Sequence, residues 1–403
     1  MSERATPPLQ GPLEGIKVVE LGTLIAGPFA SRIMAEFGAD VIKVEAPKGG
    51  DQLRGWRKMY EGTSLWWYAQ ARNKKSVTVD MRVAEGQEIV RELCADADIV
   101  IENFRPGALE KWHLGFDELA KINPRLVMVR LSGYGQTGPY RDRPGFGVIG
   151  ESMGGMRYVT GYADRPPVRL GISIGDSIAA LYGVIGAMMA LQHRHVSGKG
   201  QMVDVALYEA VFSLMESLVP EFDVLGFVRE RAGNALPGIV PSNTYPTGDG
   251  KFVIIGANND AIFKRLMKAM GRDDLADDPQ LATNAGRVPR TEEIDAAIAA
   301  WTAEHTLDAV LTALDAVDVP AAKVYDVADI VKDAQYLARG MIEQHKLPDG
   351  KPVKLPGIVP KLSETPGQTS WVGPKLGEHN AEVLGALGYD AKTQAALKAG
   401  GVI

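Results

Sequence analysis

Short apolar segments alternate with segments of helical spacing through the first third of the chain, and this alternation restricts the fold more than any other feature. Apolar runs of strand length occur at residues 16–22, 41–45, 76–81, 98–104 and 126–135. Helical spacing occupies the stretch after the first run, where Pro28 suits a first helical turn and Gly38 suits a helix end. The alternation predicts a doubly wound α/β fold, with a mostly parallel sheet and helices on both faces.

The composition of the sequence changes after Val219. Residues 230–260 are rich in turn residues, and TGDGK at 247–251 predicts a hairpin before the strand FVIIG. A helix is expected over residues 376–390, where apolar residues recur at helical spacing. The predicted parts are a large domain at residues 1–222, a smaller α+β domain at 223–329, and a return segment at 330–403 that completes the large domain.

Composition excludes several classes of protein. The formal net charge is −6, which disfavours a nucleic-acid partner bound through bulk charge. The single cysteine, Cys94, excludes an internal disulfide and a Cys-rich zinc site. His193 and His195 are the only closely spaced histidines, and their polar surroundings predict a surface turn without a metal. The first 15 residues lack the layout of a secretory signal, so we expect a cytoplasmic protein.

One acidic residue, Asp176, interrupts the apolar segment VRLGISIGDSIAALYGVIGAMMAL at residues 168–191. This segment is long enough to span a membrane, but Asp176, Ser177 and Tyr182 favour a buried core helix, and no membrane partner is expected. A carboxylate that opens such a helix accepts backbone N–H bonds and is favoured by the helix dipole. Asp176 therefore either caps the helix or acts as a nucleophile. The two roles are compatible because the same N–H groups keep the acid ionised.

Basic residues gather near strand ends in the first half of the chain. They occur in RNKKS at residues 72–76, at Arg82, within residues 103–111 and at Arg125. One interpretation is a solvated surface. The other is a cradle for a polyphosphate, because Arg and Lys side chains match phosphate oxygens.

Eight motifs occur in order along nearly the whole chain. They are LEGIKVVELG, AGPFASRIMAEFGADVIKVEAP, RNKKSVTVDM, DIVIENFRPGALEK, LSGYGQTGPY, GDSIAALYGVIGAM, GKGQMVDVALYEAV and LGEHNAEVLGALGY. Together they resemble the class III CoA-transferases, the family of formyl-CoA transferase and carnitine CoA-transferase. The resemblance implies a Rossmann-like large domain, a smaller domain, and a homodimer of two interlocked subunits with the active site near their junction.

The same resemblance places Asp176 on the family's nucleophilic aspartate. The implied reaction moves CoA from an acyl-CoA donor to a free carboxylate, through an aspartyl–acyl anhydride and an aspartyl-CoA thioester. An anhydride demands that water be excluded while it exists. CoA is then a substrate, and no permanently bound cofactor is expected.

The family's CoA contacts fall on ten positions of this sequence. They are Ile25, Ala26, Val79, Arg82, Asn103, Phe104, Arg105, Lys111, Arg143 and Phe146. Two positions depart from the family pattern. Ala46 stands where some members have an arginine, which puts an adenine contact in doubt, and Glu151 stands where glutamine is common.

Two rival functions are weighed against the transferase. The α-methylacyl-CoA racemases share the fold but carry a His-Asp pair where this chain has Phe146 and Gly147, neither of which can move a proton. The second rival is a nucleotide-binding protein without turnover.

The acceptor acid is the least determined part of the prediction. Arg157, Tyr158 and Arg169 flank the segment that carries Asp176, and an arginine could clamp a second carboxylate. This favours a dicarboxylic acceptor with succinyl-CoA or a similar donor, although surface salt bridges are an equal interpretation of these arginines. The glycine- and proline-rich residues 233–243 are a candidate acceptor-side loop.

Overall fold

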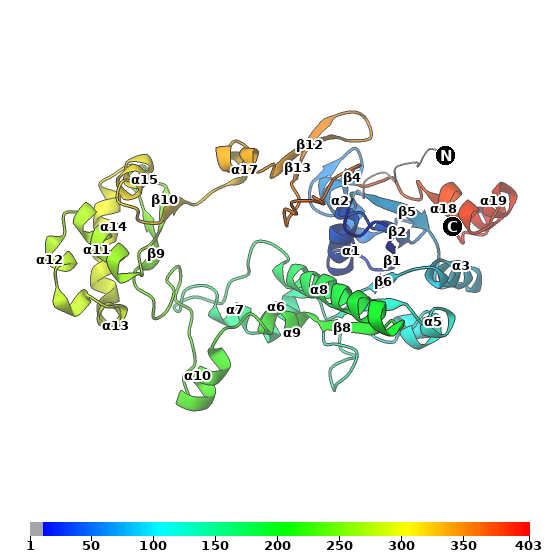
Figure 1. Ribbon diagram of the computed structural model, residues 1–403, viewed down its shortest axis with the longest axis horizontal. Helices are drawn as coiled ribbons and strands as arrows, with labels where there is room; N and C mark the ends of the chain where they lie inside the picture. The colour runs from blue at the N-terminus through cyan, green and yellow to red at the C-terminus, as the bar shows by residue number, and fades with distance from the viewer. Residues whose placement is uncertain (1–10) are drawn as a thin grey trace, which may run out of the picture. The chain divides into compact units, whose positions relative to one another are not determined.

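The computed structural model describes residues 11–403. Six parallel strands form the main sheet in the order β5-β2-β1-β6-β7-β8 (Figure 1). The strands are β1 (Lys17–Glu20), β2 (Asp40–Glu45), β5 (Lys74–Thr78), β6 (Ile99–Glu102), β7 (Val127–Ser132) and β8 (Met202–Ala206). Counted along the chain, this order is that of the doubly wound dinucleotide-binding fold. The predicted α/β class is confirmed.

The strand order reverses between β1 and β6. The chain leaves β1 toward β2 and β5 on one side, and continues from β6 to β7 and β8 on the other. Ligands of such sheets bind outside the carboxyl ends of the strands at this switch point. The loops after β1 and β6 contain residues 21–25 and 103–107, and they lie where a ligand of such a sheet is expected to bind.

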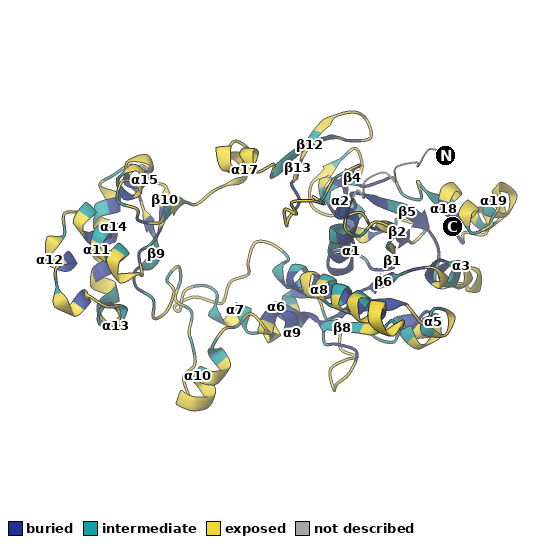
Figure 2. Cartoon of the chain, viewed as in Figure 1, coloured by how far each residue is buried: buried dark blue, intermediate teal, exposed yellow. Residues whose placement is uncertain are grey.

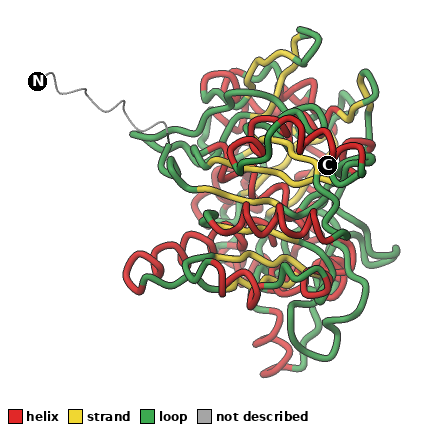
Figure 3. The backbone as a smooth tube through the Cα atoms, turned by 90° about the vertical axis from the view of Figure 1, so that its right-hand side faces the viewer, coloured by secondary structure: helices red, strands yellow, loops and turns green. Residues whose placement is uncertain are grey.

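Each face of the sheet has its own apolar core. On one face, α1 (Ala26–Glu36), α8 (Ile174–Ser197) and α9 (Leu207–Phe212) bury residues such as Met34 and Ala179. On the other face, α3 (Ala84–Ala95), α5 (Phe116–Ile122) and α18 (Asn380–Ala386) bury residues such as Ile89 and Leu384. Because α18 lies near the C-terminus, the end of the chain packs into the same core as its beginning. Figure 3 draws these strands in yellow and the helices in red.

Helix α8 lies close to the sheet because glycines face the strands. A Cβ on Gly183 would lie 3.1 Å from the side chain of Val129, and one on Gly186 would lie 2.5 Å from that of Val203. The outer face of α8 is exposed, as the yellow parts of the helix in Figure 2 show, and it contains apolar residues such as Leu181 and Met189. By length and composition α8 could cross a membrane, and a core helix of a soluble protein has the same properties.

The structure differs from the sequence predictions at three helix boundaries. Helix α8 extends to Ser197, so the exposed His193 and His195 lie in its last turns and not in a surface turn. Helix α8 begins at Ile174 with Ser173 as its N-cap, so Asp176 is the third residue of the helix and does not open it. The helix predicted over residues 376–390 is shorter in the structure. Gly377 adopts a left-handed φ of 66°, and within the predicted range only α18 is helical. A further helix, α19 (Ala391–Ala399), comes after α18.

The chain divides into two compact units. Among the described residues, the first contains 11–157, Leu170–Leu225 and Ala338–Ile403, and the second contains Tyr158–Arg169 and Gly226–Leu337. The second unit has an antiparallel sheet of β9 (Ser242–Pro246), β10 (Phe252–Gly256) and β11 (Ala321–Lys323). Its helices include α11 (Asp260–Ala269), α14 (Thr291–Ala303) and α15 (Leu307–Asp315). Residues 247–251 form the turn between β9 and β10. The domain boundaries at 222/223 and 329/330 stay a prediction.

Candidate active site

The carboxylate of Asp176 lies against the bare backbone of Gly147. Asp176 is half-buried in the first turn of α8, and Gly147 is buried at the start of α6 (Gly147–Met153). A Cβ placed on Gly147 would lie only 2.0 Å from Oδ2 of Asp176. A Cβ on Gly175 would lie 2.9 Å from the carbonyl oxygen of Gly147. The two helix starts thus approach each other through glycine, and the carboxylate occupies the space that a side chain would fill.

Glycines also bring α6 close to α9. A Cβ on Gly150 would lie 2.8 Å from Cβ of Leu207, and one on Gly154 would lie 2.7 Å from Cβ of Val211. Both contacts are tighter than ordinary van der Waals distances. The sequence GVIGESMG therefore fixes the position of α6, and with it the backbone beneath Asp176.

The loop after β1 is held by two polar side chains. Asn103 accepts a hydrogen bond from the backbone N–H of Thr23 at 2.7 Å and donates one to its carbonyl oxygen at 2.8 Å. Asp51 accepts from the backbone N–H of Leu24 at 3.0 Å. Leu24 has a φ of 65°, a conformation that a leucine rarely adopts without such support. The loop is therefore preorganised at the switch point of the sheet.

A buried ionic cluster supports this loop from below. Lys43 contacts Glu20 at 2.6 Å and Asp51 at 2.8 Å, and it also donates to the carbonyl oxygen of Gly22. Lys74 contacts the other oxygen of Glu20 at 2.8 Å. All four charged side chains are at most 1 % exposed. Two carboxylates and two ammonium groups thus neutralise each other where water cannot screen them.

The pKa values of the cluster follow from burial and pairing. Burial alone would raise the pKa of Glu20, but Lys43 and Lys74 hold it below its ordinary value. Burial alone would lower the pKa of Lys43, but Asp51 and Glu20 raise it. For Lys74 burial prevails over the attraction of Glu20 and lowers the pKa to about 8.

A pocket of about 230 Å³ opens at the carboxyl ends of the strands. It is lined by Leu21, Thr23, Lys43, Val44, Glu45, Ala46, Gly50, Asp51, Val79, Asp80, Met81, Arg82, Phe104 and Trp112. The rings of Phe104 and Trp112 meet edge to face with 5.4 Å between their centroids. The exposed guanidinium group of Arg82 is held by both oxygens of Asp80 at 2.8 and 2.7 Å. The pocket thus combines an aromatic wall with a cation at its rim.

Comparison with known protein families identifies the family to which this chain belongs. Residues 13–380 match the family model described as CoA-transferase family III. The chain belongs to CoA-transferase family III. The prediction of a class III CoA-transferase is confirmed, and with it the interpretation of the chain as an enzyme whose substrates are CoA thioesters.

Named relatives of this CoA-transferase act on succinyl or succinate groups. It is 50 % identical to succinyl-CoA–D-citramalate CoA-transferase of Chloroflexus aurantiacus, over 97 % of this chain and 98 % of the relative. It is 36 % identical to succinate–glutarate CoA-transferase of Agrobacterium fabrum, over 94 % of this chain and 97 % of the relative. A crystal structure of a CAIB/BAIF family protein from Brucella suis superposes with a TM-score of 0.83 at 37 % identity, covering 94 % of this chain and 100 % of that one.

The predicted CoA contacts of the transferase fall into two groups. Val79, Arg82 and Phe104 line the pocket at the strand ends. The others do not line it, and they are Ile25, Ala26, Asn103, Arg105, Lys111, Arg143 and Phe146. Among these, Ile25 and Ala26 are buried at the start of α1, the amide of Asn103 holds the β1 loop, and Arg105 and Lys111 are exposed.

Two of the predicted contacts lie in the loop after β7. Arg143 stacks over the ring of Tyr140 at 3.7 Å, and Phe146 is 66 % exposed. A large apolar ring with that exposure is a surface available to a ligand or a partner.

Sequence reasoning missed Trp112, Lys43 and Asp51 in the pocket wall. Lys43 carried a readable signal, because a lysine inside the apolar run VIKVE must either be paired or reach solvent. Trp112 carried none, since its place beside Phe104 depends on the turn after α4 (Ala108–Lys111).

One arginine of the clamp predicted for the acceptor acid, Arg157, already has a carboxylate partner within the chain. Nε of Arg157 lies 3.4 Å from Oε2 of Glu151, which is buried. Cγ of Glu151 would in turn lie 3.2 Å from a Cβ on Gly175, one residue before Asp176. Tyr158 donates its hydroxyl hydrogen bond to Glu230 at 2.5 Å. Arg157 and Glu151 therefore form a polar pair next to the start of α8.

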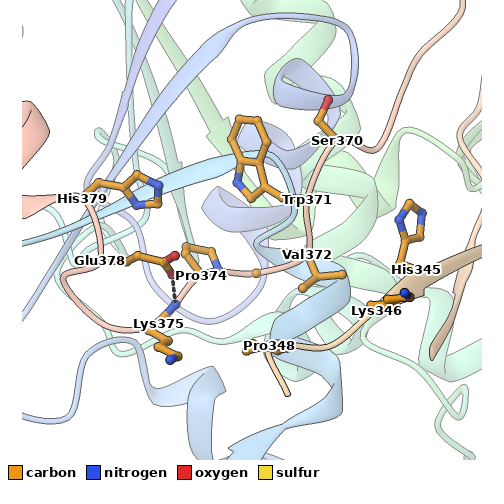
Figure 4. A pocket seen from close by; sticks show the side chains of 11 residues that line it. His345, Lys346, Pro348, Ser370, Trp371, Val372, Pro374, Lys375, Glu378 and His379 are labelled. Atoms are coloured by element: carbon orange, nitrogen blue, oxygen red, sulfur yellow. Dashed lines mark hydrogen bonds between the residues drawn. The ribbon is translucent and has the colours of Figure 1, made fainter. Parts of the chain in front are cut away.

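None of the predicted site residues lines a second and larger pocket. Its volume is about 540 Å³, and its lining includes His345, Lys346, Trp371, Lys375 and His379 (Figure 4). The carboxylate of Glu378 accepts a hydrogen bond from the backbone N–H of Lys375, drawn as a dashed line in Figure 4. Glu378 and His379 belong to the motif LGEHNAEVLGALGY, but the sequence analysis assigned no site to it.

Proposed function

We propose that this CoA-transferase moves CoA from succinyl-CoA to a dicarboxylic acid, with Asp176 as the nucleophile. The observation that carries the proposal is the half-buried carboxylate of Asp176 against the bare backbone of Gly147, a place where a reacting acyl group meets no side chain from residue 147. The printed names of the relatives, which pair succinyl-CoA with citramalate and succinate with glutarate, support the substrate class.

The reaction balances without any proton transfer. An oxygen of Asp176 attacks the thioester carbonyl of the donor, and the C–S bond breaks to give an aspartyl–succinyl anhydride and CoA thiolate. The thiolate attacks the aspartyl carbonyl, releasing succinate and leaving an aspartyl-CoA thioester. The acceptor carboxylate then attacks that carbonyl, thiolate leaves again, and its attack on the acceptor carbonyl gives the new thioester and free Asp176. Each leaving group departs with the electron pair of the bond that breaks.

The nucleotide end of CoA is assigned to the pocket at the strand ends. Phe104 and Trp112 offer an apolar surface for a base, and Arg82 offers a positive charge for a phosphate. Lys111 and Arg105 are exposed in the same βα connection and are assigned to phosphates. Ile25, Ala26, Arg143 and Phe146 are assigned to the rest of the CoA chain.

A racemase is the weaker function for this chain. Exchange of an α-proton needs an acid and a base on the substrate. Phe146 has no titratable group, and Gly147 has no side chain. The group nearest to Gly147 is the carboxylate of Asp176 itself.

The homodimer is proposed on the apolar outer surface of the large unit. Leu181, Ile185 and Met189 repeat at four-residue spacing along α8 and are 47–67 % exposed. Helix α10 (Leu218–Leu225) has no buried residue, and its Phe222 is 60 % exposed. Faces of this kind are covered by partners in soluble proteins. Sedimentation should show a dimer for the wild type and a shift toward monomer for Ile185→Glu, and a monomeric wild type would contradict this proposal. A cytoplasmic location is proposed with it.

Mass spectrometry after incubation with succinyl-CoA tests the nucleophile. A CoA adduct is expected on the peptide that contains Asp176, and Asp176→Ala should lack it and lose at least about 10³-fold in exchange rate. Asp308→Asn is the matched control, because Asp308 is an exposed aspartate in the first turn of α15. An Asp176→Ala enzyme that exchanges CoA at the wild-type rate would rule out this mechanism.

A further inference from the structure

Residue 147 faces Asp176 at a distance that no side chain tolerates. A Cβ there would lie 2.0 Å from Oδ2, 2.8 Å from Cγ and 3.3 Å from Oδ1 of Asp176. All three atoms belong to one carboxylate, so the nearest group to that position is the proposed nucleophile. The contact joins two helices, α6 and α8, that are separated by the 20 residues 154–173.

The backbone does not explain this glycine. Gly147 is the first residue of α6, and it is not among the residues with a positive φ. Alanine is therefore conformationally acceptable at this position, and inside helices it is preferred over glycine by about 1 kcal/mol. An alanine at residue 147 would, however, displace the carboxylate of Asp176.

We propose that Gly147 is a positioning residue, whose missing side chain keeps the Asp176 carboxylate in its reactive place. This inference rests on the proposed role of Asp176. With a methyl group at residue 147, Oδ2 must move by about 1 Å or more to reach a normal contact distance. The carboxylate is the flexible end of a side chain, so the clash is relieved by turning it and not by unfolding. A displacement of 1 Å at a reacting atom can cost about 100-fold in rate.

The surroundings restrict where the carboxylate can turn. Gly175 lies against the carbonyl oxygen of Gly147 and against Cγ of the buried Glu151. Movement toward Glu151 brings two carboxylates together, which is unfavourable in a partly buried site. Turning the carboxylate toward Glu151 is therefore unfavourable, and the missing side chain of Gly147 leaves room for its present position.

Gly147→Ala is compared with Gly171→Ala. Gly171 precedes α8 in the same unit, has no positive φ, and an added Cβ would meet nothing within 4 Å. In Gly147→Ala we expect kcat for CoA exchange to fall by about 100-fold, with KM for succinyl-CoA within about twofold, because the pocket assigned to the nucleotide is built from other elements. The melting temperature should change by less than about 3 °C. Gly171→Ala should behave as the wild type in all three.

The outcomes separate this inference from the proposed function. If Gly147→Ala keeps its kcat within threefold while Asp176→Ala is inactive, Asp176 is the nucleophile and the positioning role is wrong. If Gly147→Ala raises KM and lowers the melting temperature by more than about 8 °C, residue 147 is structural and the inference is also wrong. If Asp176→Ala is active, the proposed function fails. A crystal structure of Gly147→Ala should then still show the carboxylate displaced, because that effect is steric.

Discussion

Two buried or half-buried carboxylates of this CoA-transferase are surrounded in opposite ways. Glu20 ends β1 and is enclosed by the ammonium groups of Lys43 and Lys74 and by the hydroxyl of Ser31, all within 2.8 Å. Asp176 lies in the first turn of α8 against glycine backbone. One carboxylate is saturated with cationic partners, and the other lies beside a backbone without side chains.

The difference separates a structural charge from a proposed reactive one. A carboxylate that holds two lysines in a buried cluster cannot attack a carbonyl without breaking those pairs, and breaking them costs several kcal/mol. The carboxylate of Asp176 lies beside a residue that has no side chain. The buried charges of Glu20, Lys43 and Lys74 support the β1 loop, whereas the acid in the first turn of α8 lies against glycine backbone and is the proposed nucleophile.

Lys43→Ala tests the structural side of the comparison and should have the largest effect on stability. It leaves Glu20 and Asp51 with less compensation in a site closed to water, so we expect a loss of about 3–5 kcal/mol in the free energy of unfolding. Denaturant titration measures it. Lys17→Ala, which removes the exposed pair with Asp96, is the control and should cost about 0–1 kcal/mol. Equal losses in the two variants would mean that the buried cluster is not structural.

Asp51→Asn should have a smaller effect on stability and a visible one on substrate binding. The amide oxygen can still accept from the backbone N–H groups of Leu24 and Leu53, but Lys43 loses one of its two carboxylates. We expect a loss of about 1–3 kcal/mol, together with a higher KM for succinyl-CoA because the β1 loop is less ordered. Steady-state kinetics beside a denaturation curve would separate the two, and an unchanged KM would show that the loop does not contact CoA.

The sequence alone predicted the sheet because the patterns that mark strands and helices are local in the chain. Each strand is an apolar run and each connecting helix repeats every three to four residues, so the helix predicted from Pro28 and Gly38 was found close to the observed ends of α1. Asp176 stood out for the same reason, as the one acid in an apolar segment. The helix start was predicted at Asp176, whereas the helix begins at Ile174 with Ser173 as its N-cap, and the side chain of Ser173 makes no capping hydrogen bond.

What the sequence could not supply were contacts between distant residues. Gly147 and Asp176 meet only because α6 and α8 pack together, and nothing in either motif states that distance. The pairing of Lys43 with both Glu20 and Asp51 joins three separate segments in the same way. Asn103 was assigned to CoA by resemblance, whereas its amide bonds to the backbone of Thr23. Side-chain partners of this kind follow from the fold and not from a local pattern.

Asp176→Ala tests the other side of the comparison, and its effect on stability should be slight. An acidic residue in the first turn of a helix contributes about 0.3–1 kcal/mol through the helix dipole. The free energy of unfolding should therefore fall by no more than about 1 kcal/mol while exchange is lost. A loss as large as that of Lys43→Ala would place Asp176 among the structural charges, and the contrast between the two carboxylates would disappear.

The smallest expected effect is a dependence of stability on pH that originates in Lys74. Its pKa is lowered by burial to about 8 in the folded protein, against 10.5 for an exposed lysine. Between these values the unfolded chain binds the additional proton, so raising the pH from 8 to 9.5 should increase stability, by about 1 kcal/mol. Lys74→Met should lack this gain. Burial of Cys94 raises its thiol pKa to about 12 and gives the opposite slope above pH 9, but it does so in both proteins, so their difference isolates Lys74. Parallel pH profiles of the two proteins would mean that Glu20 keeps Lys74 charged throughout, and that the cluster is still more tightly paired than its contacts indicate.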